Sequence, residues 1–348
     1  MRILICTQVM DKKDSALGFF QKWVALLAPH YEAVEVICLK EGEHNLPSNV
    51  RVHSLGKESS LGSHFAKRLR YAIRFYSLAW SMRKDYDIVF VHMNQEYILL
   101  MGILWKILGK KIFMWRNHYG GSFLTDIAAA FCEKVFCTSK FSYTARYKKT
   151  VLMPVGVDED SAHMEEAIAR TPKSILFLGR LDVSKRPDLL IDALGILKKD
   201  GMDFIATFVG GPSKADSEYP AQLREQAEKL GITEDITFVG AVPNTETYRY
   251  YRSHEIFVNC SKSGMFDKTI FKAVACGCLV LATSRDFADL AGDEFVFAEN
   301  NAVSLSQKLR RFILVSPEEH ARLVGALSSC IEEHSLPVLV ERLAKEMQ

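Results

Sequence analysis

Short runs of aliphatic and β-branched residues alternate along most of the chain with longer segments of helical periodicity. We expect strands in the first half at 3–7, 33–39, 88–92, 111–115, 134–138 and 150–153, and in the second half at 174–178, 204–209, 236–239, 256–259, 279–282 and 294–297. Apolar strands that alternate with helices are typical of a parallel sheet covered on both faces. The pattern therefore predicts an α/β protein with two doubly wound, Rossmann-like domains.

The domain boundary is expected near a Pro-x-Gly turn at 154–156, which is followed by an acidic stretch and then by Thr171-Pro172. We predict an N-terminal domain over 1–165, a C-terminal domain over 166–333, and a final segment, 334–348, whose helix docks back on the N-terminal domain. Ligands of open α/β sheets bind outside the carboxyl ends of the strands. A central cleft that both sheets face with these ends is the expected site, and its candidate residues lie in the loops just after strands.

Composition removes several classes of protein. With 48% hydrophobic and 25% charged residues, the chain is neither a disordered, nor a collagenous, nor a small disulfide-stapled protein. The 44 Lys and Arg residues nearly balance 42 Asp and Glu, for a net charge of +2, so we expect no nucleic-acid partner. The balance hides uneven halves, because residues 1–170 hold 23 basic and 17 acidic residues, against 21 and 25 in the remainder.

The eight cysteines and the apolar segments indicate the compartment. The cysteines lie in apolar runs without C-x-x-C pairs, as buried hydrophobic residues do in a reducing compartment. The apolar run at 3–6 is too short for a signal peptide. The longest apolar stretch, 97–108, falls short of the roughly 20 residues that span a bilayer and is expected to be a buried helix. The expected location is the cytoplasm.

The segment 57–84 is the most uneven stretch of charge, with seven cations against one acid, Glu58, and with Phe, Tyr and Trp residues interleaved. Cations and aromatics at helical spacing can lie on an anionic membrane surface. The alternative is an amphipathic helix with its aromatic residues in the core and its cations in solvent. The first alternative would place the protein peripherally on the inner face of the cell membrane.

A pair of cations follows the strand predicted at 174–178. Gly179 lets the backbone turn and a helix is expected near Pro187, so Arg180 and Lys185 project from a loop at the carboxyl edge of the sheet. An arginine that forks two oxygens and a lysine that acts as a point charge suit a diphosphate. A solvated basic loop is the alternative.

Two further loops after strands are candidates for ligand contact. Gly210 follows a strand where a missing Cβ permits either close approach of a ligand or simply a tight turn. After the strand at 236–239, Ala241 and Val242 offer backbone groups against which a flat base could lie, although an ordinary turn would look the same.

The stretch 259–278 is the most informative. A strand enters a loop at Ser261, and the following helix is expected to start near Asp267 or Lys268 and to end at Gly277. The first amides of such a helix form a phosphate site without any special side chain. The candidate residues here are Gly264, Met265, Phe266, Asp267, Lys268 and Thr269.

The order of these motifs resembles a known family. Five segments follow one another between 154 and 277: P-V-G-V-D, G-R-L-D-x-x-K-R-P-D, F-V-G-G-P, I-T-F-V-G and S-x-S-G-M-F-D-K-T-I-F-K-A-V-A-C-G. Together they look like the retaining glycosyltransferases of family 4, which have the two-domain GT-B fold. The resemblance covers essentially the whole chain and is densest over 154–283. It says little about the sugar, and the motif order disfavours a sugar-nucleotide epimerase of the same fold.

The resemblance implies a hexosyltransferase that takes a UDP- or GDP-linked sugar as co-substrate and needs no other cofactor. Its acceptor would be a glycan or a lipid-linked molecule, in cell-surface polysaccharide or lipopolysaccharide synthesis. Arg180 and Lys185 match the cationic pair that assists the leaving diphosphate. His118 resembles the histidine that faces the donor sugar, although a structural role is as plausible, and Gly18 falls where backbone approaches donor and acceptor.

Two positions depart from the family pattern. The family usually carries E-x7-E across the phosphate loop and the next helix, whereas this chain has Gly264 and Lys272. The second glutamate would accept hydrogen bonds from ribose hydroxyls, which a lysine cannot do; Lys272 could instead approach a phosphate or a sugar carboxylate. A catalytically silent homologue that binds a partner protein or a glycan is therefore the alternative function.

An Asp-x-Asp sequence at 85–87 is a metal signature in a different glycosyltransferase fold. It directly precedes the strand predicted at 88–92, so we interpret it as a turn and predict no required metal.

Overall fold

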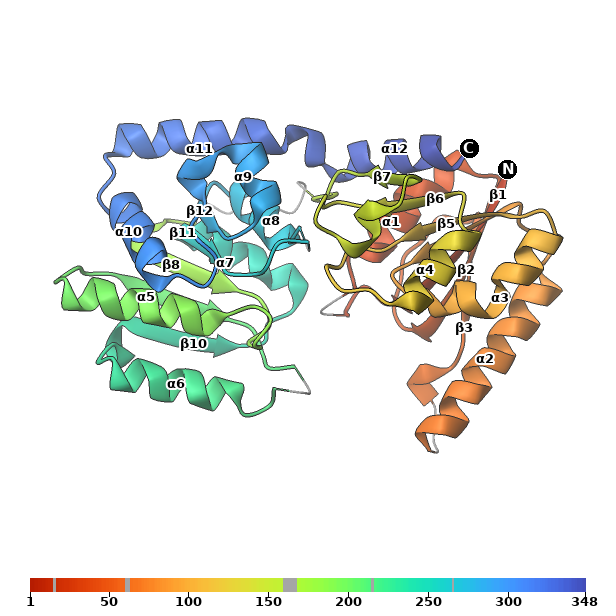
Figure 1. Ribbon diagram of the computed structural model, residues 1–348, viewed down its shortest axis with the longest axis horizontal. Coiled ribbons are helices and arrows are strands. Elements are labelled where there is room, and N and C mark those ends of the chain that lie inside the picture. The colour runs from red at the N-terminus through yellow and green to blue at the C-terminus, as the bar shows by residue number, and fades with distance from the viewer. Residues whose placement is uncertain (15–16, 60–62, 159–167, 214–215, 265) are drawn as a thin grey trace. The chain divides into compact units, whose positions relative to one another are not determined.

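The computed structural model describes residues 1–14, 17–59, 63–158, 168–213, 216–264 and 266–348 (Figure 1). They form two compact units, of which the first contains Met1–Pro154 and Pro337–Gln348 and the second contains Val155–Leu336. The boundary predicted between 165 and 166 lies outside the described residues. Each unit is built on a parallel sheet, which confirms the α/β class.

The first unit has a seven-stranded parallel sheet in the order β3-β2-β1-β4-β5-β6-β7. All six strands expected in this half are present, and β3 is an addition. The order runs outward from β1 to β3 and then returns to β4, so the topological switch point lies between β1 and β4. The strands are β1 (Arg2–Met10), β2 (Ala33–Glu41), β3 (Val50–Ser54), β4 (Ile88–His92), β5 (Lys111–Trp115), β6 (Lys134–Cys137) and β7 (Thr150–Leu152).

Helices cover both faces of this sheet. Phe75 of α2 (His64–Ser81), Trp105 of α3 (Glu96–Ile107) and Ala128 of α4 (Phe123–Phe131) share one core with the strands. Strand side chains alternate between faces, and on the opposite face Trp23 of α1 (Phe20–Leu27) packs edge-on against Trp115, with ring centroids 4.9 Å apart. Short 3₁₀ helices are η1 (Ala28–His30), η2 (Lys57–Ser59) and η3 (Tyr143–Arg146).

Two helices of the first unit differ from expectation. The α3 helix is buried on one side, but Leu100, Ile103 and Ile107 are exposed, the last to 75%, so the predicted buried helix is buried on one side only. In α2 the ring of Phe75 is buried and Tyr71 and Leu78 pack partly against the same core, whereas five other large apolar side chains are exposed, three of them aromatic. A core role for most of its aromatics is therefore contradicted. The exposed large apolar residues of α2 are Phe65, Leu69, Ile73, Tyr76 and Trp80. No described helix is long and apolar enough to cross a bilayer.

The chain passes between the units twice, at 154–155 and at 336–337. Beside these passages Val157 and Ser335 form a parallel bridge, and the carbonyl of His334 accepts from the amides of Gly156 and Val157 at 3.0 and 2.9 Å. The last helix, α12 (Leu336–Met347), then belongs almost entirely to the first unit. Lys134 at the start of β6 holds it by donating to the Glu346 carbonyl and carboxylate, both at 2.9 Å.

The second unit has a five-stranded parallel sheet in the order β10-β9-β8-β11-β12. Five of the six expected strands are present. The prediction at 294–297 is wrong, because 293–295 form a 3₁₀ helix and Val296 makes a single isolated bridge to Ala282. The strands are β8 (Thr171–Leu178), β9 (Ile205–Val209), β10 (Ile236–Gly240), β11 (His254–Asn259) and β12 (Leu279–Ala282).

Helices surround this sheet and bury its apolar strands in one continuous core. They are α5 (Pro187–Lys199), α6 (Tyr219–Lys229), α7 (Thr247–Ser253), α8 (Lys268–Ala275), α9 (Arg285–Ala291), α10 (Ala302–Ile313) and α11 (Pro317–Ile331), with 3₁₀ helices η4 (Thr233–Asp235), η5 (Asn244–Glu246), η6 (Asp293–Phe295) and η7 (Glu332–His334). The helices predicted to begin near Pro187 and near Asp267 are confirmed, and the Gly277 that ends α8 has a φ of +77°.

The backbone of Gly210 lies very close to the backbone of the neighbouring loop at the carboxyl edge of the second unit's sheet. Its φ is +148°, and a Cβ added there would lie 1.7 Å from the carbonyl oxygen of Gly179. Its amide donates to the Gly240 carbonyl at 2.9 Å. The loops after β8, β9 and β10 are therefore packed backbone against backbone at this point.

We expect Gly210→Ala to lower the free energy of unfolding by about 2–3 kcal/mol, because the loops must separate to admit the methyl group. Chemical denaturation measures this loss. Gly325→Ala is the matched control: it lies inside α11 with nothing within 4 Å of the new Cβ, so it should stabilise the fold by up to about 1 kcal/mol. Equal effects of the two substitutions would contradict the described packing.

Candidate active site

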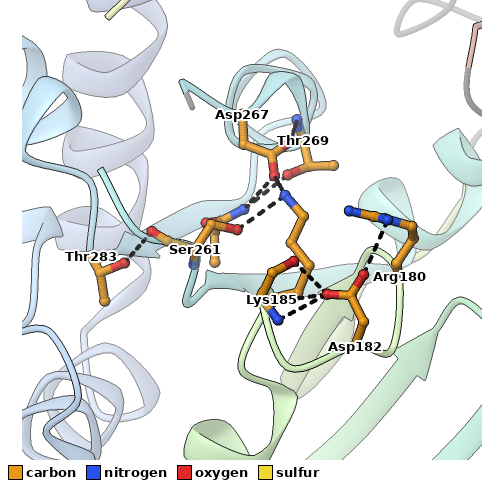
Figure 2. Close-up of polar contacts among 9 residues, drawn as sticks. Arg180, Asp182, Lys185, Ser261, Asp267, Thr269 and Thr283 are labelled. Carbon is orange, nitrogen blue, oxygen red and sulfur yellow. Dashed lines mark hydrogen bonds and ion pairs between the residues drawn. The ribbon is translucent and has the colours of Figure 1, made fainter. Parts of the chain in front are cut away.

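Polar side chains gather in the second unit where the strand order reverses. The chain runs from β8 through β9 to the edge strand β10 and then returns to β11 beside β8. The loops after β8 and β11 diverge from this point to α5 and α8, which leaves the carboxyl edge open to ligands. Figure 2 shows that Lys185, from the first loop, reaches Ser261 and Asp267 of the second.

Lys185 and Asp267 form an ion pair with 2.5 Å between Nζ and Oδ2, and both side chains are only 15% exposed. Burial disfavours the charged carboxylate, but the ammonium of Lys185 and the hydrogen bonds of Thr269 prevail and lower the pKa of Asp267 to about 2. Lys185 also donates to Ser261 Oγ at 3.2 Å. An ammonium has three donor hydrogens, and within the described residues two of them are accepted by Asp267 and Ser261, which leaves the third for a ligand oxygen.

The carboxylate of Asp267 also accepts hydrogen bonds from Thr269 of α8 and from Asn259 of β11. As the N-cap of α8 it accepts from the Thr269 amide at 3.1 Å through Oδ1. Asn259, the last residue of β11, donates to Asp267 Oδ2 at 3.3 Å and to Thr269 Oγ1 at 3.1 Å. Thr283 donates to the Ser261 carbonyl at 2.6 Å and so fixes the entry of the loop.

Asp182 organises the loop that carries both candidate cations. Its Oδ1 accepts from the amides of Ser184 and Lys185 at 3.1 and 3.2 Å, while its Oδ2 lies 3.2 Å from Arg180 Nη1. The carboxylate is nearly buried, whereas the side chain of Arg180 is 60% exposed. Arg180 is therefore anchored at one nitrogen and presents the rest of its guanidinium to solvent.

The predicted phosphate loop reaches α8 through Gly264, whose φ of +97° favours glycine, and through the buried ring of Phe266. Met265 lies outside the described residues. The helix begins at Lys268, so the amides of Lys268 and Thr269 are its first. Burial and the neighbouring charge of Lys272 lower the pKa of Lys268 well below its usual value, while Asp158 opposes the shift.

The residues predicted near a base lie on the other side of β8. A Cβ added at Gly211, next to Gly210, would be 3.2 Å from Ala241 Cβ, so the loops after β9 and β10 are neighbours. Ala241 is exposed and Val242 is half-buried against the core. The described candidates of the second unit, apart from those on α8, thus follow the carboxyl ends of four adjacent strands, from β10 to β11.

Lys272 lies on the second turn of α8. Its Nζ donates to Asn244 Oδ1 at 2.9 Å and lies 5.0 Å from the ring centroid of Tyr248. The side chain that replaces the expected glutamate therefore contacts the connection after β10.

The two remaining predicted residues belong to the first unit. Gly18 follows β1, and a Cβ there would meet the carbonyls of Asp14 and Lys12 at 2.6 and 2.9 Å. His118 follows β5 and stacks on Tyr119 with centroids 4.4 Å apart. Its Nδ1 lies 2.8 Å from the Gly120 amide and 3.2 Å from the Gly120 carbonyl, so the backbone of Gly120 holds this side of the ring. The strands β1 and β5 lie on either side of β4.

Sequence reasoning did not single out Asp182, Asn259, Thr283 or Asn244. Asp182 stands within the G-R-L-D-x-x-K motif, so its short spacing to Lys185 was a usable signal. The segment 85–87 is the predicted turn, in which Asp87 accepts from the amide of Arg2 at 2.9 Å just before β4. No group of three or more His, Cys, Asp or Glu side chains suited to a metal occurs among the residues that can be described, and the absence of a metal requirement stays a prediction.

Comparison with known proteins decides the family. A family model described as "Glycosyl transferases group 1" matches residues 158–325, and one described as "Glycosyl transferase 4-like" matches residues 13–116. The chain belongs to the group 1 glycosyl transferases. The first match contains every described donor-site candidate of the second unit, from Arg180 to Lys272.

Curated relatives match this group 1 chain in part. A D-inositol 3-phosphate glycosyltransferase of Geodermatophilus obscurus is 30% identical over 154 residues, which are 41% of this chain and 34% of that protein. The alpha-monoglucosyldiacylglycerol synthase of Streptococcus pneumoniae is 25% identical over 261 residues, 64% of this chain and 57% of that protein. The chain thus spans about a third of the length of the first of these relatives and over half of the second.

Solved structures match the whole fold. Alr3699/HepE of Anabaena, crystallised with UDP, superposes with a TM-score of 0.78 at 16% identity over 99% of each chain. At this identity the likeness concerns the fold alone, and it confirms the predicted GT-B fold.

The Lys185–Asp267 pair predicts a pH-dependent contribution to stability. Because the pKa of Asp267 falls from 3.8 to about 2 on folding, its ionised form stabilises the fold above about pH 4. That contribution, about 2 kcal/mol at neutral pH, is lost as the pH falls from about 4 to 2. Asp267→Asn should therefore be less stable than the wild type at pH 7, and the difference should shrink at pH 3.

Denaturation of both proteins at pH 7, 4 and 3 measures this difference. Glu225→Gln removes an exposed pair with Lys229 and should leave the pH dependence almost unchanged, since exposed pairs contribute little. A difference between wild type and Asp267→Asn that stays constant with pH would refute the ionised pair.

Proposed function

We propose that this chain transfers a hexose-type sugar from a nucleoside diphosphate sugar to a glycan or lipid-linked acceptor, with retention of anomeric configuration. The observation that carries the proposal is the position of Lys185, held by the largely buried Asp267 at the switch point between β8 and β11 beside the start of α8. A role in cell-surface polysaccharide or lipopolysaccharide synthesis fits an acceptor of this kind.

The proposed chemistry rests on stabilising the departing diphosphate. As the bond from the anomeric carbon to the diphosphate breaks, negative charge grows on the phosphate oxygens, and Arg180, Lys185 and the positive N-terminal end of the α8 dipole supply positive charge there. The acceptor oxygen attacks from the face that the diphosphate leaves. A diphosphate oxygen takes the acceptor proton, so the step requires no side-chain nucleophile.

We propose the nucleotide of the donor from the residues near the base and from a structural neighbour. The loops after β9 and β10 offer Gly210, Ala241 and Val242 as backbone contacts for the base, and the Anabaena neighbour was crystallised with UDP and with UDP-glucose. UDP-sugars are therefore the first donors to test and GDP-sugars the second. In the first unit, Gly18 would let backbone approach the substrates, and His118 would offer its ring Nε2 to the sugar.

A panel of UDP- and GDP-sugars with product detection tests the proposal, in EDTA because we propose no metal requirement. Arg180→Ala should lower turnover by about 100-fold or more through lost charge stabilisation in the transition state. Its stability should change little, since the side chain is 60% exposed. Lys229→Ala, an exposed lysine on α6, is the matched control. Full turnover by Arg180→Ala, or turnover only after Mg²⁺ addition, would contradict the proposed mechanism.

A catalytically silent homologue that binds a partner protein or a glycan is the second candidate. Lys272 favours it, because this side chain contacts Asn244 where the family usually places a carboxylate. Thermal shift with UDP and GDP separates the two: stabilisation by either nucleotide supports the enzyme, and stabilisation by neither supports the silent homologue.

We also propose that the protein lies peripherally on the inner face of the cell membrane through the segment 57–84. Large apolar side chains recur along the outer side of α2 at Phe65, Leu69, Ile73, Tyr76 and Trp80, and Phe65 is 78% exposed. The segment carries seven cations and one acid. A membrane suits this surface better than solvent does. The apolar groups would enter the bilayer, and the cations would meet anionic headgroups.

Sedimentation with vesicles of anionic and of neutral lipids tests the membrane proposal. We expect binding to anionic vesicles at low salt, weakened by high salt. Arg74→Gln should weaken binding about fivefold, since a cation near the surface contributes about 1 kcal/mol, and Ile73→Ser should weaken it by a similar factor or more. Leu314→Ser, an exposed apolar residue of the second unit, is the control. Equal sedimentation of all four proteins would contradict the assignment.

A further inference from the structure

A polar contact joins the helix of the phosphate loop to the connection after β10. Lys272 Nζ donates to Asn244 Oδ1 at 2.9 Å, and the ring of Tyr248, buried in α7, lies beneath the ammonium. Asn244 follows Ala241 and Val242 by a few residues, and Lys272 follows the first amides of α8 by one turn. The pair therefore joins the connection that carries the backbone proposed for the base to the helix whose N-terminal end is proposed for the phosphates.

The lysine fixes the orientation of the Asn244 amide. An ammonium can only donate, so the oxygen of the amide must face Lys272, and the amide nitrogen must face away. Within the part of the chain that the structure describes, Nδ2 of Asn244 donates to no protein acceptor, and the residue is half-exposed. Asn244 thus presents two donor hydrogens at the carboxyl edge of the sheet.

The geometry points to Asn244 as a binding residue for the ribose of the donor, with Lys272 as the residue that positions it; this inference rests on the proposed function. In a nucleoside diphosphate the ribose joins the base to the diphosphate, so it must lie between the two sites that this pair connects. Asn244 Nδ2 donates to a ribose hydroxyl oxygen. A chain without a carboxylate at position 272 therefore recognises ribose by donating a hydrogen bond.

The consequence is selectivity for ribonucleotides over their deoxy forms. Removal of the contacted hydroxyl leaves the Asn244 donor without an acceptor in a partly dehydrated site. One such hydrogen bond corresponds to a preference of about 3- to 10-fold. The preference depends on the orientation of the amide, so it should also depend on the donor at position 272.

Calorimetric titration of UDP and GDP, and of their 2′-deoxy and 3′-deoxy forms, tests the inference. The wild type should prefer the ribonucleotide over at least one deoxy form by about 3- to 10-fold. Asn244→Ala should bring this ratio close to 1. Lys272→Met, which frees the amide to turn over, should lower the ratio, whereas Lys272→Arg, which can still donate, should keep it. Lys229→Ala is the control, and thermal melting verifies that each variant is folded.

The outcomes separate this inference from the proposed function. A wild type that binds ribo- and deoxynucleotides equally, or an Asn244→Ala variant that keeps the wild-type ratio, overturns the role of Asn244 and leaves the donor proposal intact. A ratio unchanged in Lys272→Met overturns the positioning role of Lys272. Binding of neither UDP nor GDP to the wild type overturns the donor proposal and with it this inference.

Discussion

The ion pair between Lys185 and Asp267 is the constraint on which the candidate site depends. Removing either charge from water alone, to 15% exposure, would cost free energy, and the attraction between the two charges offsets that cost. The same carboxylate caps α8, so a single side chain fixes the lysine, the start of the helix and the loop between them. Two loops from distant parts of the sequence thereby acquire one geometry before any ligand arrives.

The parallel strands could be predicted because each is a short, nearly continuous apolar run, as burial on both faces requires. The errors have physical causes. The β3 strand is an edge strand with alternating polar residues such as Arg51 and His53, so it lacks that signature. The acidic pair Asp293-Glu294 starts a 3₁₀ helix where hydrophobicity indicated a strand. For α3, apolar residues all around the helix indicated burial, but hydrophobicity alone does not say which side meets the core and which stays exposed.

The candidate site was predictable as a set of loops and less so as a set of contacts. Arg180, Lys185, Gly210, Ala241 and the residues before α8 all follow strands, and adjacent parallel strands bring such loops to one edge. The partners of Lys185 and Lys272 could not be predicted, because both contacts join segments far apart in the sequence. Which cation is buried with a carboxylate and which remains exposed is decided by packing, and the sequence shows only that both are present.

The route of the chain bears on how the protein is made. The second unit is a single insertion, Val155–Leu336, between two parts of the first. During synthesis, residues 1–154 leave the ribosome long before the helix α12 that completes their unit. The second unit is fully synthesised before α12 is. The apolar surface that Leu339, Leu343 and Met347 finally cover stays uncovered in the meantime. The unit that begins the chain is therefore the last to be finished, and its incomplete form is the one most exposed to aggregation and to chaperones.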